Sequence, residues 1–348
     1  MEFIDKAIAC GATDVHIEAD GQAVMRQLGE LVALGPCTKA RFETLFQALY
    51  KKRTFFDSIV ENEDTKVKDF SLSLESGERL RVRRYQTRGR AALAIRFLPR
   101  TVPELGDLAW PEAIYHFARL RSGLVLVTGP TGSGKSTTLA ALMTQIAKAR
   151  ACHIITYESP IEYIIEGERA LVHQRQVPED AISFAQGAQE AMRLDPDVVM
   201  LGELVEKEAM QAALRLAESG HLVLATMHAA SSSDAVRYLL NHFDGLERQM
   251  VTEQLAQCLR GVVTQRLLAN EEKTQLLPVY EILLANSAVK NIIRTDGLVQ
   301  LASAIENGRS EGMISLEESL ARLVQRRALS LAVAKDNANS LPLLERWL

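Results

Sequence analysis

The feature that most constrains the fold is a glycine-rich turn between an apolar run and a helix-forming run. In the stretch GLVLVTGPTGSGKSTTLAALM, residues 123–143, Gly129, Gly134, Lys135 and Ser136 have the spacing G-x-x-x-x-G-K-S. Glycines let backbone amides turn inward as a nest for phosphate oxygens, because no Cβ blocks the approach. The helix that follows points its N-terminus at the same anion. The stretch therefore predicts a phosphate-binding loop after a buried strand.

In loops of this kind the lysine reaches the β- and γ-phosphates of a nucleotide, and the hydroxyl beside it ligates Mg²⁺. We therefore expect ATP and Mg²⁺ as cofactors, with Lys135 and Ser136 in these two roles. The predicted nucleotide-binding residues are Gly129, Pro130, Thr131, Gly132, Ser133, Gly134, Lys135, Ser136 and Thr137.

Composition narrows the class of protein. Hydrophobic residues make up 47% and charged residues 24% of the 348 residues, as in globular proteins, and the formal net charge of −4 argues against stable nucleic-acid binding. Four scattered cysteines form no CxxC pair, so neither a zinc site nor a disulfide framework is indicated. The start of the chain does not have the pattern of a signal peptide, and no window approaches the ~18 apolar residues of a membrane span. We expect a cytoplasmic protein that reaches membranes only through partners.

The order of patterns along the chain predicts two domains. Residues 1–100 mix two helical patterns with alternating strand patterns, which predicts a small α+β domain. A linker is expected at 101–108, within the proline-rich stretch PRTVPELGDLAWP. In the remainder, 109–348, four short apolar runs alternate with helical stretches, which is typical of an α/β fold with a parallel sheet. From about residue 247 to 348 the pattern predicts mainly helices.

Two carboxylate sites follow later strands of the predicted parallel sheet. Glu158 comes directly after IITY, with Glu162 four residues on, and Glu203 follows VVMLG. The carboxyl ends of parallel strands face the ligand crevice, so we expect Glu158 and Glu203 beside the γ-phosphate as catalytic acids. One would polarise the attacking water and the other would hold Mg²⁺; the sequence does not assign the roles, and Glu203 is also a candidate metal-binding residue beside Ser136. The alternative for each is a helix-start acid that interacts with the helix dipole.

A histidine follows another strand of the same sheet. The stretch HLVLATMH places Thr226 and His228 at the end of that strand, and a polar group there can contact the γ-phosphate or the water. His228 is therefore a further catalytic candidate.

These stretches together resemble a known family. GATDVHIEADG, GLVLVTGPTGSGKSTTLAALM, HIITYESPIEYI, DPDVVMLGEL, AESGHLVLATMHAASSSDAV and AVKNIIR occur in the order found in the secretion ATPases of bacterial type II and type IV systems. The chain is most similar to the twitching-motility, or pilus-retraction, branch. The resemblance implies an N-terminal PAS-like domain and a RecA-like P-loop ATPase core, assembled as a homohexamer with nucleotide held between the domains. It further implies that Arg81 and Arg96, at the positions of the family's arginines, reach the phosphates as catalytic residues.

The resemblance also implies a function. A motor of this branch hydrolyses ATP, works on an inner-membrane platform protein of a type IV pilus from the cytoplasmic face of the bacterial inner membrane, and retracts the pilus. A sibling motor of a conjugative or type IVB secretion system is the first alternative. The second is a weakly hydrolysing nucleotide-binding regulatory subunit that partners a stronger motor.

Two departures from the family pattern support these alternatives. Ser159 stands where the acidic box usually carries aspartate, and Val205 and Glu206 stand where Arg-Asp usually follows Gly-Glu-Leu. Reduced or differently regulated turnover would follow from the loss of these charges, although Lys135 and the key glutamates are retained.

Overall fold

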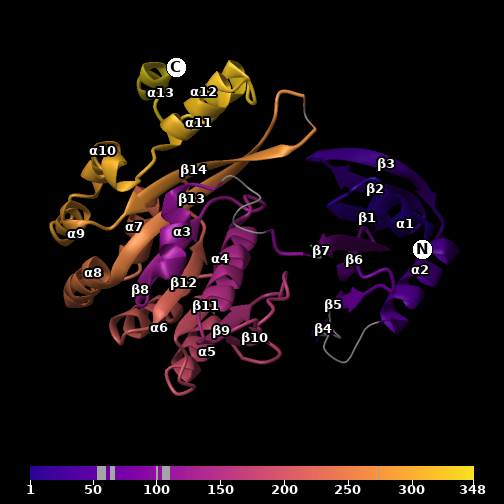
Figure 1. Cartoon of the computed structure of the whole chain (residues 1–348). Coiled ribbons are helices and arrows are strands. Elements are labelled where there is room, and N and C mark those ends of the chain that lie inside the picture. The colour runs from indigo at the N-terminus through magenta and orange to yellow at the C-terminus, as the bar shows by residue number, and fades with distance from the viewer. Residues whose placement is uncertain (53–59, 63–66, 99–100, 104–109, 273) are drawn as a thin grey trace. The chain divides into compact units, whose positions relative to one another are not determined.

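The chain folds into two compact units. The computed structural model describes residues 1–52, 60–62, 67–98, 101–103, 110–272 and 274–348. One unit is Met1–Thr101, here the N-terminal unit, and the other is Val102–Leu348, the C-terminal unit (Figure 1). Most of the stretch proposed as a linker, 101–108, lies outside the described residues. The two units are described separately.

The N-terminal unit is built on one antiparallel sheet of order β3-β2-β1-β7-β6-β5-β4. Two helices pack on it, because the apolar faces of α1 and α2 share one core with residues such as Val15 and Leu80. Thr38 caps α2 by accepting a hydrogen bond from the Arg41 backbone N–H at 3.3 Å. The elements are α1 (Glu2–Ala9), β1 (Asp14–Glu18), β2 (Gly21–Gln27), β3 (Glu30–Cys37), α2 (Lys39–Lys51), β4 (Val60–Asn62), β5 (Val67–Ser73), β6 (Arg79–Thr87) and β7 (Arg90–Leu98).

The C-terminal unit is built on a sheet of order β10-β9-β11-β12-β8-β13-β14, parallel except for the last strand. The parallel part is the one that its apolar runs predict. Its strands are β8 (Gly123–Thr128), β9 (His153–Glu158), β10 (Leu171–Gln176), β11 (Val198–Leu201), β12 (Leu222–Met227), β13 (Leu259–Ala269) and β14 (Leu276–Leu284).

Helices cover both faces of this sheet (Figure 1). Leu124 and Leu126 of β8 pack in one core cluster with α6 and α7, while Val125 and Val127 pack in the other with α3 and α4. Burial on both faces is why the parallel strands are continuous apolar runs. The covering helices are α3 (Glu112–Arg119), α4 (Lys135–Ala149), α5 (Phe184–Ala191), α6 (Lys207–Glu218), α7 (Ser232–Leu240) and α8 (Gly245–Cys258).

The prediction that the chain is mainly helical from about residue 247 was wrong for two segments. Helix α8 ends at Cys258, and Leu259–Ala269 and Leu276–Leu284 form the hairpin β13–β14, with β13 parallel to β8. The physical reason is the run Val262, Val263 and Thr264, whose β-branched side chains are buried on both faces of the pleated sheet. Beyond the hairpin the helices are α9 (Ser287–Arg294), α10 (Leu301–Asn307), α11 (Leu316–Gln325), α12 (Leu331–Asn337) and α13 (Leu341–Trp347), with 3-10 turns η1 (Leu298–Gln300) and η2 (Arg309–Glu311).

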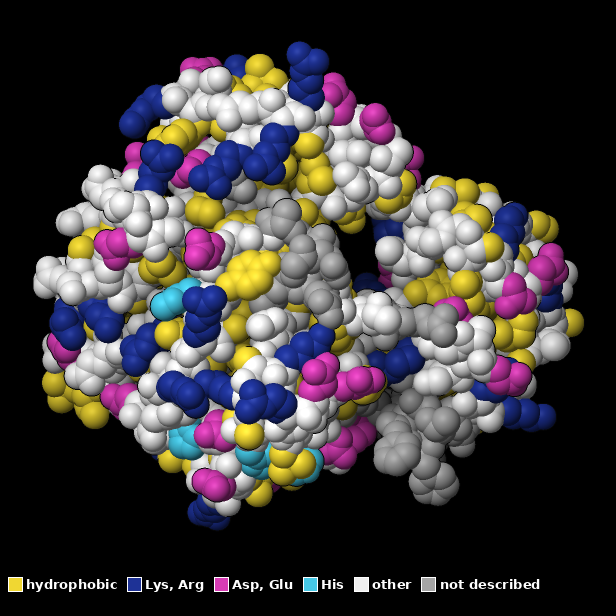
Figure 2. Space-filling view, in the orientation of Figure 1, with side chains coloured by type: hydrophobic (Ala, Val, Ile, Leu, Met, Phe, Trp, Pro, Cys, Tyr) yellow, Lys and Arg dark blue, Asp and Glu magenta, His cyan; other side chains and the backbone are white. Residues whose placement is uncertain are grey.

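The surface is of mixed charge. Basic and acidic side chains both occur across the visible face of the C-terminal unit (Figure 2). Among the residues that the structure describes, no helix has the combination of length and apolar composition needed to span a bilayer.

The central strand β12 offers a test of the core. Replacing Leu224, which is fully buried, by alanine is expected to lower the free energy of unfolding by about 2–5 kcal/mol, because the cavity adds to the lost apolar burial. Urea unfolding followed by circular dichroism would measure it. The matched control is Leu171→Ala on the edge strand β10, where the side chain is 57% exposed. Equal losses for both variants would contradict the assigned core.

Candidate nucleotide-binding site

The predicted phosphate loop joins β8 to α4, which begins at Lys135. Gly129 has φ +142°, and a Cβ built there would lie 2.2 Å from the backbone oxygen of Gln265. Only glycine allows the loop to leave β8 this close to β13. The loop thus opens at the carboxyl end of the parallel sheet, as the sequence predicts.

Lys135 is folded back over the loop. Its Nζ donates hydrogen bonds to the carbonyl oxygens of Gly129 and Pro130, both at 2.9 Å. Burial lowers the pKa of Lys135, and the carboxylates Glu203 and Glu162 oppose part of that shift. An ammonium held by two weak neutral acceptors can exchange them for phosphate oxygens, which bind it more strongly.

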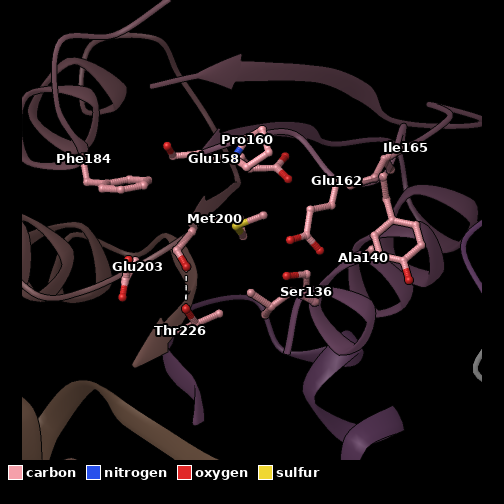
Figure 3. A pocket seen from close by; sticks show the side chains of 14 residues that line it. Ser136, Ala140, Glu158, Pro160, Glu162, Ile165, Phe184, Met200, Glu203 and Thr226 are labelled. Atoms are coloured by element: carbon pink, nitrogen blue, oxygen red, sulfur yellow. Dashed lines mark hydrogen bonds between the residues drawn. The ribbon is translucent and has the colours of Figure 1, made fainter. Parts of the chain in front are cut away.

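A pocket beside the loop collects side chains from the ends of three strands and from the first turn of α4. It is lined by Ser136 of α4, by Glu158 at the end of β9 and Glu162 beyond it, by Glu203 after β11 and by Thr226 of β12, among others. In Figure 3 the Glu162 carboxylate points toward the Ser136 hydroxyl, whereas Glu203 lies on the side of the pocket away from Ser136. The crossover connections of the sheet bring these residues together from positions far apart in the sequence.

Glu158, the last residue of β9, is held rigidly. Its Oε1 accepts hydrogen bonds from Thr156 Oγ1 at 2.6 Å and from Gln174 Nε2 at 3.0 Å, and the side chain is buried. Both donors come from neighbouring positions of the sheet. The fixed orientation suits a carboxylate that must keep one position in the pocket wall while a ligand enters.

Glu203 and His228 form a pair across the ends of β11 and β12. Glu203 Oε1 lies 2.9 Å from His228 Nε2, with 40% of the Glu203 side chain and 48% of the His228 side chain exposed. The Thr226 hydroxyl donates to the Gly202 carbonyl (Figure 3). The Leu204 N–H donates to the Thr226 carbonyl at 2.8 Å. The two strand ends are therefore linked, and an acid and an imidazole stand together where a water could be activated.

The site also contains residues that the sequence prediction did not include among the site residues. Glu162 contributes a carboxylate close enough to influence Lys135, and the Tyr163 hydroxyl lies 2.8 Å from Thr137 Oγ1. The sequence feature that could have indicated Glu162 as a site residue was its position two residues after Pro160, in the turn that follows the strand. Gln265 of β13 also contacts the loop; nothing in its local sequence marks it.

Arg81 and Arg96 lie in the N-terminal unit. They stand directly opposite each other on the neighbouring strands β6 and β7. Arg96 Nε donates to Asp14 Oδ1 at 2.9 Å. Their contact with phosphates stays a prediction.

The oxygen donors of the pocket fit Mg²⁺. The Ser136 hydroxyl and the carboxylates of Glu162 and Glu203 are hard ligands of the kind that this ion prefers. Within the described ranges no cluster of three or more His, Cys, Asp and Glu side chains is arranged to hold a metal by itself.

A buried polar chain runs behind the loop from β8 to β14. Thr128 Oγ1 lies 2.8 Å from Thr264 Oγ1, which lies 3.4 Å from Ser232 Oγ, and the Ser232 N–H donates to Glu281 Oε1 at 2.6 Å. The pKa of Glu281 is raised, mainly because the carboxyl group is buried and to a smaller extent because Glu317 lies near it. The hydrogen bonds from Ser232 and the charge of Arg266 oppose part of this shift. The start of α7 is thereby tied to a carboxyl group inside the fold.

Glu281→Gln tests this buried group. A carboxyl whose folded-state pKa is raised stabilises the fold below its ordinary value of 4.5, and this contribution is lost as pH rises through the folded-state pKa. The glutamine variant carries no charge, so its free energy of unfolding relative to the native chain is expected to rise as pH increases from about 4.5. Urea unfolding across a pH series would measure it, with the exposed Glu272→Gln as control. Parallel pH profiles of the native and Glu281→Gln chains would contradict the assignment.

A parallel sheet with a glycine-rich phosphate loop and an acid–histidine pair at its carboxyl end defines the class of P-loop nucleotide-binding proteins. A family model described as "Type II/IV secretion system protein" matches residues 1–341, and the chain belongs to that family.

Individual relatives agree with the family. The chain is 37% identical over 272 residues to a twitching motility protein of Neisseria gonorrhoeae, covering 78% of this chain and 73% of that protein. It is 33% identical over 332 residues to the type IV pilus retraction ATPase PilT of Pseudomonas aeruginosa, covering 94% of each. A crystal structure of the pilus retraction motor PilT with bound ADP superimposes with a TM-score of 0.85 at 32% identity, covering 99% of this chain and 98% of that one. These matches confirm the resemblance to the twitching-motility branch and the predicted fold class, a RecA-like P-loop core with an N-terminal PAS-like α+β domain.

Proposed function

We propose that this chain is the ATP-hydrolysing motor of type IV pilus retraction. The observation that supports it most is the pocket beside the phosphate loop, which is lined by Ser136 and three glutamates, Glu158, Glu162 and Glu203, with His228 paired to Glu203. The chain is similar over nearly its whole length to a pilus retraction ATPase. The loop amides and Lys135 bind the phosphates. Glu203, paired with His228, accepts a proton from the attacking water, and Glu158 keeps the pocket wall in place. Mg²⁺, held by Ser136 and by the carboxylate that points toward it, Glu162, would neutralise charge that develops on the β- and γ-phosphates.

We further propose how hydrolysis is coupled to movement. The chain acts as a homohexamer. Arg81 and Arg96 complete charge neutralisation when the domains close, so ATP binding favours the closed state and hydrolysis releases it. The motor works at the cytoplasmic face of the inner membrane on a platform protein of the pilus machine.

We favour retraction over the two alternatives. The relatives described above are named for twitching motility and pilus retraction rather than for conjugation or secretion of another kind. A weakly hydrolysing regulatory subunit is disfavoured because two carboxylates remain in the acidic box despite Ser159: Glu158 and Glu162 both line the pocket.

Two assays test the proposal. The purified protein should show Mg²⁺-dependent ATP hydrolysis, and its gene should restore twitching to a strain that lacks its retraction motor. Background hydrolysis in a folded hexamer would contradict the motor. Hydrolysis without restored twitching would favour the conjugative or type IVB machine.

A further inference from the structure

Gln265 of strand β13 lies directly beside the phosphate loop. β13 runs parallel to β8 with Thr264 opposite Thr128, so the next residue, Gln265, falls beside the first loop residue, Gly129. Side chains alternate along a strand, and Val263 packs in the core cluster that contains α4. The Gln265 side chain therefore lies on the α4 face, and it is only 2% exposed.

Both polar atoms of the Gln265 side-chain amide form hydrogen bonds, one with the phosphate loop and one with helix α4. Gln265 Nε2 donates to the backbone carbonyl of Ser133 at 2.6 Å, and Gln265 Oε1 accepts from Thr138 Oγ1 at 2.7 Å. A carbonyl can only accept, so the amide nitrogen must face Ser133 and the Thr138 hydroxyl must be the donor. The hydrogen-bond pattern thus fixes the amide in one orientation.

The bond to Ser133 also fixes the direction of an amide in the loop. In a trans peptide the carbonyl of one residue and the N–H of the next point to opposite sides. Because the Ser133 carbonyl is held on Gln265, the Gly134 N–H is directed away from β13, toward the open side of the loop. Gly134 adopts φ +85°, and inward-pointing amides in such turns are the anion-binding elements of a nest.

We propose that Gln265 is a positioning residue for nucleotide phosphate: it holds the Ser133–Gly134 peptide so that the Gly134 N–H faces the phosphate oxygens. The proposal rests on the nucleotide binding proposed above and adds the residue that orients the loop. Without the hydrogen bond from Gln265 to the Ser133 carbonyl, the Ser133–Gly134 peptide can rotate, and the Gly134 N–H is no longer preformed as a donor to phosphate. Thr138 supports this role because its hydroxyl donates to Gln265 Oε1 and so keeps the Gln265 side-chain amide from flipping.

The first test replaces Gln265 by methionine, which keeps the length of the side chain and removes both hydrogen bonds. The Kd for Mg·ADP, measured by fluorescent-nucleotide titration, is expected to rise about 10- to 30-fold, as for the loss of one hydrogen bond to a charged phosphate oxygen. KM for ATP should rise in parallel, with kcat changed by no more than about twofold, because ground state and transition state lose the same contact. A merely structural defect would instead lower the active fraction and kcat and leave the Kd unchanged.

A second series tests the support from Thr138. Thr138→Val removes the donor to Gln265 and should raise the Kd by about three- to tenfold, whereas Thr138→Ser keeps the hydroxyl and should restore native affinity. The double variant with Gln265→Met should bind as weakly as Gln265→Met alone, since both act through one amide. Thr144→Val is the matched control: its buried hydroxyl lies on the same helix and has no hydrogen-bond partner among the described residues.

A folded Gln265→Met protein with native affinity for Mg·ADP would overturn the proposal. If that variant does not fold, the Thr138 pair decides, because equal affinities of the valine and serine variants would overturn the proposal as well. Failure of the native protein to bind Mg·ADP would contradict the proposed function instead. The two failures are therefore distinguishable.

Discussion

Replacing Lys135 by alanine is expected to raise the Kd for ATP by about 100-fold or more and to reduce hydrolysis to background. The ammonium now donates to the Gly129 and Pro130 carbonyls, and in the bound state it donates to phosphate oxygens. Hydrogen bonds between charged partners contribute about 1.5–3 kcal/mol each, so the loss of two of them accounts for about two to four orders of magnitude in affinity. Isothermal titration with ATP and a phosphate-release assay would measure the two effects.

The control for this variant lies on the same helix. Lys148 of α4 forms an ion pair with Glu168 at 3.8 Å, and neither residue lines the pocket. Lys148→Ala should keep native affinity and turnover. Native-like ATP binding by Lys135→Ala would show that the loop does not hold the phosphates as proposed.

Glu203→Gln is expected to lower kcat by about 100- to 1000-fold while ATP binding is retained. The substitution keeps the volume of the side chain and removes the charge that would accept a proton from the attacking water. The pair with His228 at 2.9 Å keeps the glutamine in place. Turnover at saturating ATP and a separate binding titration would show the split between kcat and Kd.

The same variant separates the two roles that remained open for Glu203. If the carboxylate acts as the base, kcat stays low at every Mg²⁺ concentration. If it mainly holds Mg²⁺, high Mg²⁺ recovers much of the activity. The exposed Glu208→Gln, on the first turn of α6, is the charge-matched control. Undiminished turnover in Glu203→Gln at all Mg²⁺ concentrations would exclude both roles.

Local chemistry made much of the site predictable. The loop residues and the strand-end residues Glu203 and His228 carry their signal in adjacent residues, because apolar strands, glycine turns and helix starts are each short-range patterns. Glu162 and Gln265 carried no comparable signal, since the role of Glu162 comes from its charge near Lys135 and that of Gln265 from its hydrogen bond to Ser133.

Strand β13 of the hairpin β13–β14 shows where the sequence pattern failed to predict the fold. The stretch EQLAQCLRGVVTQRLL, residues 253–268, has helical spacing, yet only its first part, up to Cys258, is helical and the rest forms most of β13. Pairing with β8 buries Val262 and Val263 on opposite faces, and this tertiary gain overrides local helix propensity.

The sequence by itself determined the parallel α/β class, the phosphate loop, and the acids and histidine at the strand ends, because each depends on residues within a few positions of one another. Only the tertiary structure decided which groups meet: that Glu203 pairs with His228, that Glu158 accepts a hydrogen bond from Gln174, and that Gln265 holds the loop. The physical reason is that sheet register and crossover connections set these contacts, and neither leaves a local pattern in the chain.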